Sequence, residues 1–313
     1  MFKKILQGFI CLLITASLSL CFVGCGVKPP KNAEYYYSFT DALERKIVLD
    51  KKPERVAALI GSFADVWMLS GGELVATAED AWEDFGLDTH ALNIGGAHSP
   101  SVEKLLSANP DFVIASASTA ANIEIKETLT AAGITVAYFD VDNLDDYLKM
   151  LKICTDITGR KDLYEKNGSD IEEKVEKIKA EFNNKNIPQE KRTILLLRAS
   201  TGSVKAKDSK GTVLGEMLYS IGCINIADSE KGLLENLSVE SIIKNEPYHI
   251  FVVTMGDEVK AKENLETLIT DNPAWAEILA VKENRLHIMD RRLYNLKPNE
   301  EWAVAYEKLC EIF

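Results

Sequence analysis

Short apolar runs alternate with amphipathic segments along most of the chain. The strand-like runs span residues 55–61, 74–78, 112–116, 134–139, 193–197, 249–254 and 285–289. Segments with helical spacing separate them, and the chain closes with a predicted helix at 300–313. Residues 35–41 and 46–50 alternate as in a β-hairpin. Alternating strands and helices are typical of βαβ units, so the pattern predicts an α/β fold with mainly parallel sheets.

One segment of this pattern occurs twice, at residues 101–114 and 238–251. Both copies share a Ser-Val-Glu start and a later proline at the same spacing. Each copy predicts a short helix, a proline stop and a strand buried on both faces. Each also places a glutamate, Glu103 or Glu240, in the first helical turn, where the helix dipole favours a carboxylate. The repeat predicts two similarly built lobes, although Ser-x-Glu starts many helices and the similarity could arise by chance.

The segment between the two copies has a different composition. Residues 145–182 are rich in Lys and Glu, and Ile171, Val175, Ile178 and Phe182 recur at helical spacing. We expect one helix at 169–182, which either connects two lobes or covers one of them. The predicted organisation is an N-terminal α/β lobe at 35–157, a connector helix at 158–184 and a C-terminal α/β lobe at 185–313. A ligand cleft is expected between the lobes.

The N-terminus is expected to lie outside the fold. Lys3 and Lys4 precede an apolar stretch at 5–20, and Gly24-Cys25 is followed by a polar, Pro-rich segment. This order is similar to a bacterial lipoprotein signal, with a signal peptide at 1–24, a lipidated Cys25 and a tether to residue 34. The alternative is an uncleaved transmembrane anchor. Both interpretations place the rest of the chain outside the cytoplasm, because the lysines stay inside.

Charge and composition exclude several classes of function. The chain has 36 Lys and Arg against 48 Asp and Glu, a net charge of −12. It shows neither a basic stripe nor a Gly-rich phosphate loop, so we expect no nucleic-acid partner and no nucleotide cofactor. Outside the N-terminal segment the cysteines are Cys154, Cys223 and Cys310, which have no metal-site spacing and are expected to be buried.

Several loose motifs occur in a consistent order along the chain. They are 41–49 leading into Pro53-Glu54-Arg55-Val56, Gly95-Gly96, Asn109-Pro110-Asp111, Gly222 with Asn225, Asn272-Pro273-Ala274-Trp275, and 296–302. In this order they resemble the periplasmic binding proteins for iron complexes and cobalamin, known as class III, from about Phe39 to the end of the chain. Glu44 departs from that pattern, because a turn glycine is usual at its position.

The resemblance implies two lobes joined by a single long helix, with little hinge closure. It also implies that the protein is no enzyme and that it captures a ferric siderophore, haem or a corrinoid and delivers it to an ABC importer. In such proteins one glutamate on each lobe docks into the permease dimer, and these positions correspond to Glu103 and Glu240. The alternative is that both glutamates serve only the helix dipole. We expect a monomer held at the membrane by its lipid.

Ligand contacts are expected just after the strands, because open α/β sheets bind ligands at the carboxyl ends of their strands. Arg198 ends an apolar strand and could pair with an anionic siderophore or a haem propionate, or with a carboxylate of the protein. In the hydroxamate binders of the family that the chain resembles, an arginine near the position of Pro100 contacts the ligand. Ala97-His98-Ser99 occupies that place here, so a hydroxamate bound in this manner is not expected. The full set of predicted ligand residues is Trp82, His98, Arg198, Lys207, Arg292 and Tyr294. Lys207 could equally lie in a solvated loop, and Trp82 and Tyr294 could simply pack against other side chains of the protein.

Two other functions stay open at this point. A binding protein for free Zn²⁺ or Mn²⁺ would need several converging histidines, and the chain has four in all. We therefore expect no residue of this chain to be a metal ligand. An extracytoplasmic hydrolase would need a nucleophile motif such as Gly-x-Ser-x-Gly or His-Glu-x-x-His, and neither motif is present.

Overall fold

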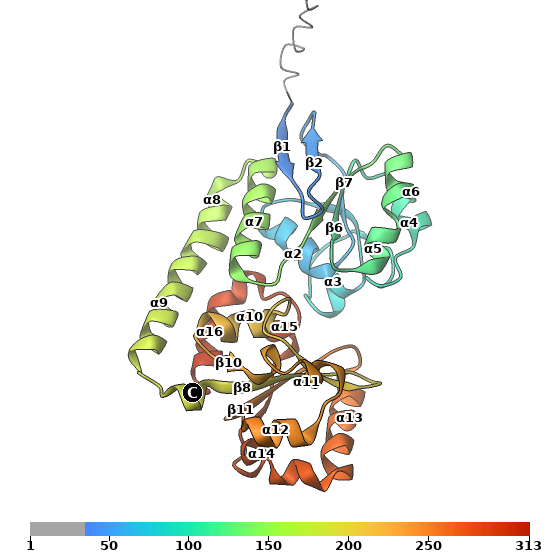
Figure 1. The fold of residues 1–313 in the computed structure, drawn as a ribbon. Helices are drawn as coiled ribbons and strands as arrows, with labels where there is room; N and C mark the ends of the chain where they lie inside the picture. The colour runs from blue at the N-terminus through green and yellow to red at the C-terminus, as the bar shows by residue number, and fades with distance from the viewer. Residues whose placement is uncertain (1–34) are drawn as a thin grey trace, which may run out of the picture. The chain divides into compact units, whose positions relative to one another are not determined.

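The computed structural model of the protein describes residues 35–313 (Figure 1). The predicted signal peptide at 1–24, Cys25 and the tether to residue 34 lie outside the described residues. Residues 36–313 form one compact unit by themselves. Among the helices of residues 35–313, none combines the length and the apolar character needed to cross a membrane.

The first lobe is built on a five-stranded sheet in which every pair of neighbours is parallel. Its strands, in spatial order, are β5 (Leu92–Asn93), β4 (Leu74–Thr77), β3 (Val56–Ala58), β6 (Phe112–Ser116) and β7 (Thr135–Phe139). All five residues of β6 are buried, as expected for a strand covered on both faces. The accompanying helices are α2 (Gly61–Leu69), α3 (Asp80–Glu83), α4 (Val102–Ser107), α5 (Ala120–Glu124) and α6 (Lys126–Ala131). The predicted hairpin is confirmed as antiparallel β1 (Tyr37–Thr40) and β2 (Lys46–Leu49).

The second lobe repeats this arrangement with one addition. Its parallel strands, in spatial order, are β10 (Ile224–Asn225), β8 (Thr193–Ala199), β11 (His249–Thr254) and β12 (Leu286–Ile288). The accompanying helices are α10 (Val213–Ser220), α11 (Lys231–Glu235), α12 (Val239–Asn245), α13 (Glu258–Asp271), α14 (Leu279–Lys282), α15 (Arg291–Tyr294) and α16 (Trp302–Cys310). The addition is β9 (Val204–Lys207), which pairs antiparallel with β8. The expectation that Lys207 lies in a loop is therefore wrong. The two parallel-sheet lobes confirm the predicted fold class.

The two copies of the repeated segment have the same local structure. α4 and α12 begin after Ser101 and Ser238, and each serine Oγ accepts the backbone N–H of the third residue after it at 3.3 Å. Each helix is followed by a left-handed residue just before the proline, Asn109 with φ of 49° and Glu246 with φ of 42°. These shared caps explain why the sequence pattern recurs.

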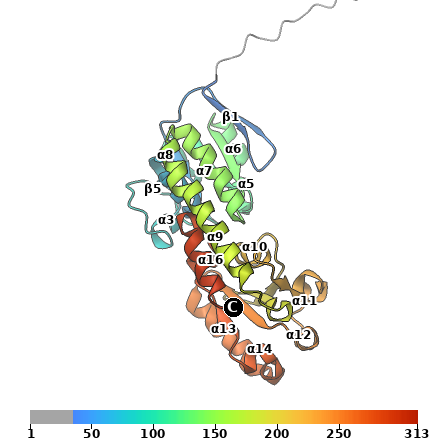
Figure 2. The same ribbon diagram turned by 90° about the vertical axis from the view of Figure 1, so that its left-hand side faces the viewer.

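A long helical segment joins the lobes. α7 (Leu144–Thr158) is followed by α8 (Lys161–Tyr164), a π-helical turn at Glu165–Ser169, and α9 (Asp170–Asn184). Ile171, Val175 and Phe182 are buried, which confirms most of the predicted apolar stripe. Figure 2 shows α9 running beside α16, and the two helices pack together. The predicted helix at 169–182 is thus confirmed as part of a longer one, while the division at 158–184 stays a prediction.

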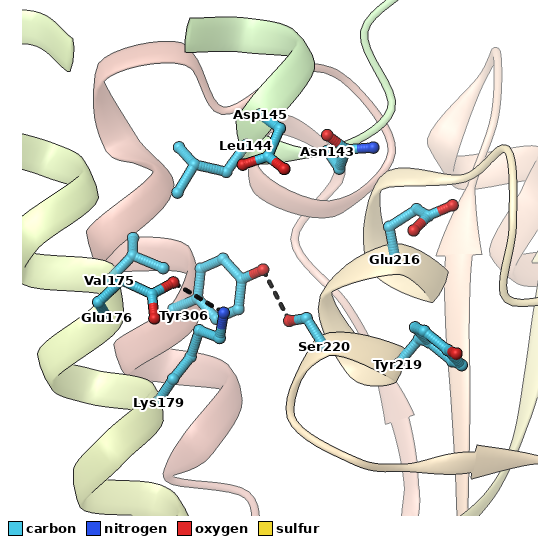
Figure 3. Close-up of a pocket in the computed structure, with 10 residues that line it drawn as sticks. All are labelled: Asn143, Leu144, Asp145, Val175, Glu176, Lys179, Glu216, Tyr219, Ser220 and Tyr306. Atoms are coloured by element: carbon cyan, nitrogen blue, oxygen red, sulfur yellow. Dashed lines mark hydrogen bonds and ion pairs between the residues drawn. The ribbon is translucent and has the colours of Figure 1, made fainter. Parts of the chain in front are cut away.

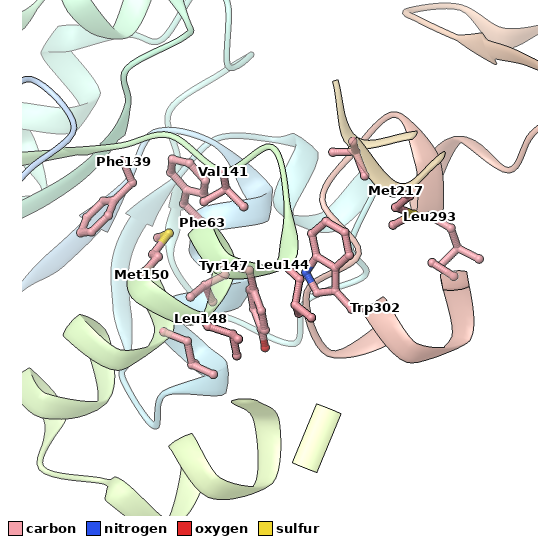
Figure 4. Close-up of a cluster of buried hydrophobic side chains, with 14 of the residues drawn as sticks. Phe63, Phe139, Val141, Leu144, Tyr147, Leu148, Met150, Met217, Leu293 and Trp302 are labelled. Carbon is pink, nitrogen blue, oxygen red and sulfur yellow. The ribbon is translucent and has the colours of Figure 1, made fainter. Parts of the chain in front are cut away.

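The largest cluster of buried apolar side chains contains residues from both lobes (Figure 4). Phe63 and Phe139 belong to the first lobe, and Met217 and Trp302 to the second. Two smaller clusters each cover the other face of one sheet. One continuous core therefore joins the two sheets.

Two histidines pair at the amino ends of neighbouring strands in the second lobe. Nδ1 of His249 in β11 lies 3.0 Å from Nε2 of His287 in β12. His249 is 4% exposed, and its ring packs on Phe313 with 4.8 Å between ring centroids. Burial is the main cause that lowers the pKa of His249 to about 4, and the charges of His287 and Arg285 contribute to the same shift. His249 is therefore neutral in the folded protein at neutral pH.

We predict that Gly61→Ala destabilises the protein, because a methyl group there would lie 2.6 Å from the backbone nitrogen of Ala81. Overpacking of this kind costs about 1–3 kcal/mol in the free energy of unfolding. Urea denaturation followed by circular dichroism measures it. Gly202→Ala is the matched control, since its φ is ordinary and nothing lies within 4 Å of the place that a methyl group would take there. Equal denaturation midpoints for both variants would contradict the prediction.

We also predict that acidification destabilises the fold through His249. An unfolded histidine protonates near pH 6.5, whereas folded His249 does so near pH 4. The stability that depends on neutral His249 is therefore fully present above about pH 6.5 and is lost as the pH falls toward 4. Between pH 7 and pH 5, the expected loss in the free energy of unfolding from this residue is about 2 kcal/mol.

Urea denaturation at pH 7, 6 and 5 tests this expectation. His249→Asn should lack that part of the pH dependence, while His90→Asn, at an exposed position, should keep the wild-type dependence. If the His249 variant lost as much stability on acidification as the wild type, the buried pair would not be the cause.

Candidate ligand-binding site

The sheet topology marks one place in each lobe where a ligand site is expected. In the first sheet β3 lies beside β6, and the next strands along the chain, β4 and β7, lie on opposite sides of this pair. In the second sheet β8 and β11 have the same relation, with β10 and β12 outside them. Such open α/β sheets bind ligands in the crevice at the carboxyl ends of the two central strands. The candidate site therefore comprises the residues that end or follow these strands.

Two ion pairs connect the lobes near these strand ends. Arg291, just after β12, donates two hydrogen bonds to Asp84 of the first lobe, one of them with 3.1 Å between Nη2 and Oδ2. Lys297 Nζ lies 3.2 Å from Oδ1 of Asp142, which follows β7. The partners in these pairs are far apart in the chain, so no short-range pattern in the sequence could have matched them.

A buried amide makes a third connection between the lobes. Asn299 is fully buried, and its Nδ2 donates to the carbonyl oxygen of Ser62 at 2.9 Å and to Oδ2 of Asp65 at 2.8 Å. Burial raises the pKa of Asp65, although the hydrogen bond from Asn299 acts against this shift. The turn before α16 is thereby fixed to α2 of the first lobe.

Arg292, a predicted ligand residue, is engaged by the protein itself. Its guanidinium carbon lies 4.2 Å from the centroid of the Phe85 ring, and Nη1 donates to the carbonyl oxygen of Lys297. Nη2 lies 3.6 Å from Asp65 and 3.7 Å from Glu301. A ligand would have to displace these partners, so a ligand role for Arg292 stays a prediction.

Tyr294, predicted to stack on a ligand, faces the core. It is 3% exposed, and its hydroxyl donates to the carbonyl oxygen of Ala305 at 2.9 Å. The expectation that its ring lines the cleft is wrong, because the four-residue helix α15 turns this side chain toward α16.

Trp82 lies in the short helix α3 and not in a loop, whereas His98 lies in a loop of the first lobe. Trp82 is half-buried against the main core, and its Nε1 donates to the carbonyl oxygen of Thr89 at 3.3 Å. His98 is exposed, and its ring takes part in none of the hydrogen bonds or ion pairs of the described residues. A ligand role for either side chain stays a prediction.

Arg198 and Lys207 lie on one face of the antiparallel pair β8 and β9. Arg198 stands opposite Lys205, and Leu196 stands opposite Lys207. We call Arg198, Lys205 and Lys207 the basic strip. Nε of Arg198 is buried and has no hydrogen-bond partner. Burial lowers the pKa of Arg198, while the charge of Asp142 opposes this shift.

The two predicted docking glutamates are exposed, one on each lobe. Glu103 lies in the first turn of α4 and Glu240 in the first turn of α12. Neither carboxylate takes part in an ion pair or side-chain hydrogen bond within residues 35–313, so both are free to meet a partner.

A separate pocket of about 200 Å³ lies where α7, α9, α10 and α16 approach one another (Figure 3). Tyr306 and Ser220 share a hydrogen bond of 2.9 Å at its wall, and Lys179 pairs with Glu176 at 2.8 Å. None of the predicted ligand residues lines this pocket.

Within residues 35–313, no group of three or more His, Cys, Asp or Glu side chains is placed to hold a metal ion. His249 and His287 already pair with each other at the amino ends of their strands, away from the candidate site. His90 and His98 are exposed.

Comparison with known proteins identifies the family. A family model described as "Periplasmic binding protein" matches residues 56–293. The iron-uptake system-binding protein of Bacillus subtilis (strain 168) is 22% identical over 253 residues, which cover 79% of this chain and 71% of that protein. The Fe(3+)-citrate-binding protein YfmC of the same organism is 24% identical over 279 residues, with 83% and 82% covered.

A solved structure has the same fold. The periplasmic heme-binding protein RhuT from Roseiflexus sp. RS-1 superposes with a TM-score of 0.68 at 22% identity, covering 83% of this chain and 97% of that one. The family model, the relatives and the fold agree with the resemblance seen in the sequence. The chain therefore belongs to the periplasmic binding protein family, whose members are substrate-binding proteins and not enzymes.

Proposed function

We propose that the protein captures an iron complex outside the cytoplasm, either a ferric siderophore or haem, and delivers it to an ABC importer. A corrinoid is the remaining cargo of this class. The names of the relatives support iron as the cargo, since one belongs to an iron-uptake system and another binds ferric citrate. The observation that carries the proposal is a set of cations without an ion pair at the carboxyl end of β8, the edge at which open α/β sheets bind ligands.

Capture is proposed to require little movement of the lobes. The main core runs from one lobe into the other, and Asn299 fixes a turn of the second lobe to the first. A packed core of this kind resists a large hinge rotation. The ligand would then enter a largely formed crevice, with side chains rather than whole lobes adjusting to it.

Delivery is proposed to use the lipid anchor and the two glutamates. Cys25 would hold the protein at the membrane, near the permease. Glu103 and Glu240 occupy equivalent places in the two repeated helices, so one matching charge from each lobe can meet each subunit of a permease dimer. Their exposure and lack of partners support this role.

A titration tests the proposed cargo. A form that begins at Gly26 keeps the whole compact unit of residues 36–313. We expect sub-micromolar saturation by one iron complex from a panel of ferric catecholate, hydroxamate and citrate complexes, haem and cobalamin. Quenching of tryptophan fluorescence reports it, because Trp82 is half-buried in α3, which follows the carboxyl end of β4.

Trp82→Phe is the control, since it should reduce the quenching more than the affinity measured by calorimetry. Saturation by free Zn²⁺ or Mn²⁺ alone, or by nothing in the panel, would contradict the proposed cargo.

The docking role predicts that Glu103→Ala and Glu240→Ala each weaken binding to the cognate permease by about tenfold, because a charge pair is lost at the interface. Ligand affinity should stay unchanged, since both residues lie on helices outside the crevice. Uptake of labelled cargo in cells and pull-down with the permease measure the effect. Glu266→Ala, at an exposed position on α13, is the matched control. Reduced ligand affinity in the docking variants would argue against this role.

A further inference from the structure

We infer that the basic strip is a polyanion-binding site, and that the cargo presents carboxylate or catecholate oxygens to Arg198, Lys205 and Lys207. This inference rests on the proposed function and specifies the chemical class of the iron complex. The anionic oxygens could belong to a ferric chelate or to haem propionates. A neutral or cationic ferric hydroxamate lacks them.

The strand register places like charges side by side. Arg198 in β8 is directly opposite Lys205 in β9, so both side chains project from the same face of the sheet. Leu196 and Lys207 form the pair on the same face two residues away, which adds a third cation. Like charges in directly opposite positions destabilise a sheet unless an anion lies between or above them. A bound polyanion would remove this repulsion.

Arg198 is also the exception among the arginines of the described residues. Every other arginine within 35–313 donates at least one hydrogen bond to the protein. Arg198 donates none, and its Nε is buried. A buried donor without an acceptor is costly, and a guanidinium fork is matched by a carboxylate. The missing acceptor is therefore expected to come with the ligand.

Within residues 35–313, no carboxylate forms an ion pair with the basic strip. The charge of Asp142, in the first lobe, acts against the lowered pKa of Arg198, but this carboxylate is already held by Lys297 at 3.2 Å. Acidic residues are in excess in this chain, with 48 Asp and Glu against 36 Lys and Arg. Three cations without an ion pair at a strand end therefore do not reflect a shortage of carboxylates.

The two arginines that follow β12 differ from Arg198, because each has a carboxylate of the protein beside it. Arg291 is paired with Asp84 across the lobes, and Arg292 lies near Asp65. Both are neutralised by the protein, so they contribute little to attracting an anion. Arg198 in the basic strip has no such carboxylate beside it, so its positive charge is available to an anion.

Isothermal titration of the form that begins at Gly26 tests the inference with four ligands: ferric citrate, a ferric tricatecholate, haemin and a ferric trihydroxamate. Wild-type protein is expected to bind an anionic ligand at least tenfold more tightly than the trihydroxamate, with an affinity that falls as salt rises. The double variant R198Q/K205Q should lose at least tenfold in that affinity. The control R160Q/K177Q makes the same charge change on exposed residues of the connector and should bind as the wild type does.

The variant Lys205→Glu supplies the basic strip with a carboxylate of the protein itself. It places a carboxylate opposite Arg198, so we expect a higher melting temperature together with loss of anion binding. A misfolded protein would instead melt at a lower temperature. Strip dependence of haemin binding would identify propionates as the anionic groups, and strip dependence of citrate or catecholate binding would identify a chelate.

Tight anionic binding that is unchanged in R198Q/K205Q and Lys205→Glu, or a preference for the trihydroxamate, would overturn the inference while the proposed function stands. If no iron complex binds, iron-free citrate distinguishes a failure of the proposed function from a failure of the inference about the basic strip. If no iron complex bound but citrate raised the melting temperature of the wild type and not of Lys205→Glu, the proposed function would fail and the strip would stand as an anion site. If neither citrate nor any iron complex bound, both would fail.

Discussion

One continuous cluster of buried apolar side chains joins the two lobes, and the relation between the two sheets depends on it. Phe63 of the first lobe and Trp302 of the second belong to the same cluster, and each is at most 1% exposed. Close-packed side chains of this kind do not slide past one another without losing contacts. The connector adds to the constraint, because α9 packs along α16. The groups at the strand ends are therefore held in set positions before any ligand arrives.

The polar contacts between the lobes follow from this constraint. Once the core brings the lobes together, charged groups near the junction lose water and must find partners. Asp65 meets both Asn299 and Arg292, and Asp84 meets Arg291. Arg198, at the carboxyl end of β8, has no such partner. Asp65 and Asp84 thus join the lobes, whereas Arg198 is left without an acceptor among the described residues.

The candidate site was predictable in part. Arg198 was found because a cation at the end of an apolar strand is unusual in any sequence. Lys205 lies beside Arg198 only because residues 204–207 form the antiparallel strand β9. The sequence pattern did not show this strand, since two lysines around one alanine resemble a polar loop. Arg292 and Tyr294 were placed in the crevice from their position after a strand. The short helix α15 directs them instead to Asp65 and to the core, and no local pattern specifies that direction.

By itself the sequence determined most of the elements, the repeated unit and the family. Periodicity, caps and proline stops act over a few residues, so the residues around Ser101 and Ser238 are enough to identify them as equivalent helix starts. Only the tertiary structure decided which charges meet. Asp84 and Arg291 are 207 residues apart, and their contact depends on the packing of both lobes. The register of β8 against β9 likewise decided that Arg198 and Lys205 stand together, because pairing between strands is a property of the folded sheet.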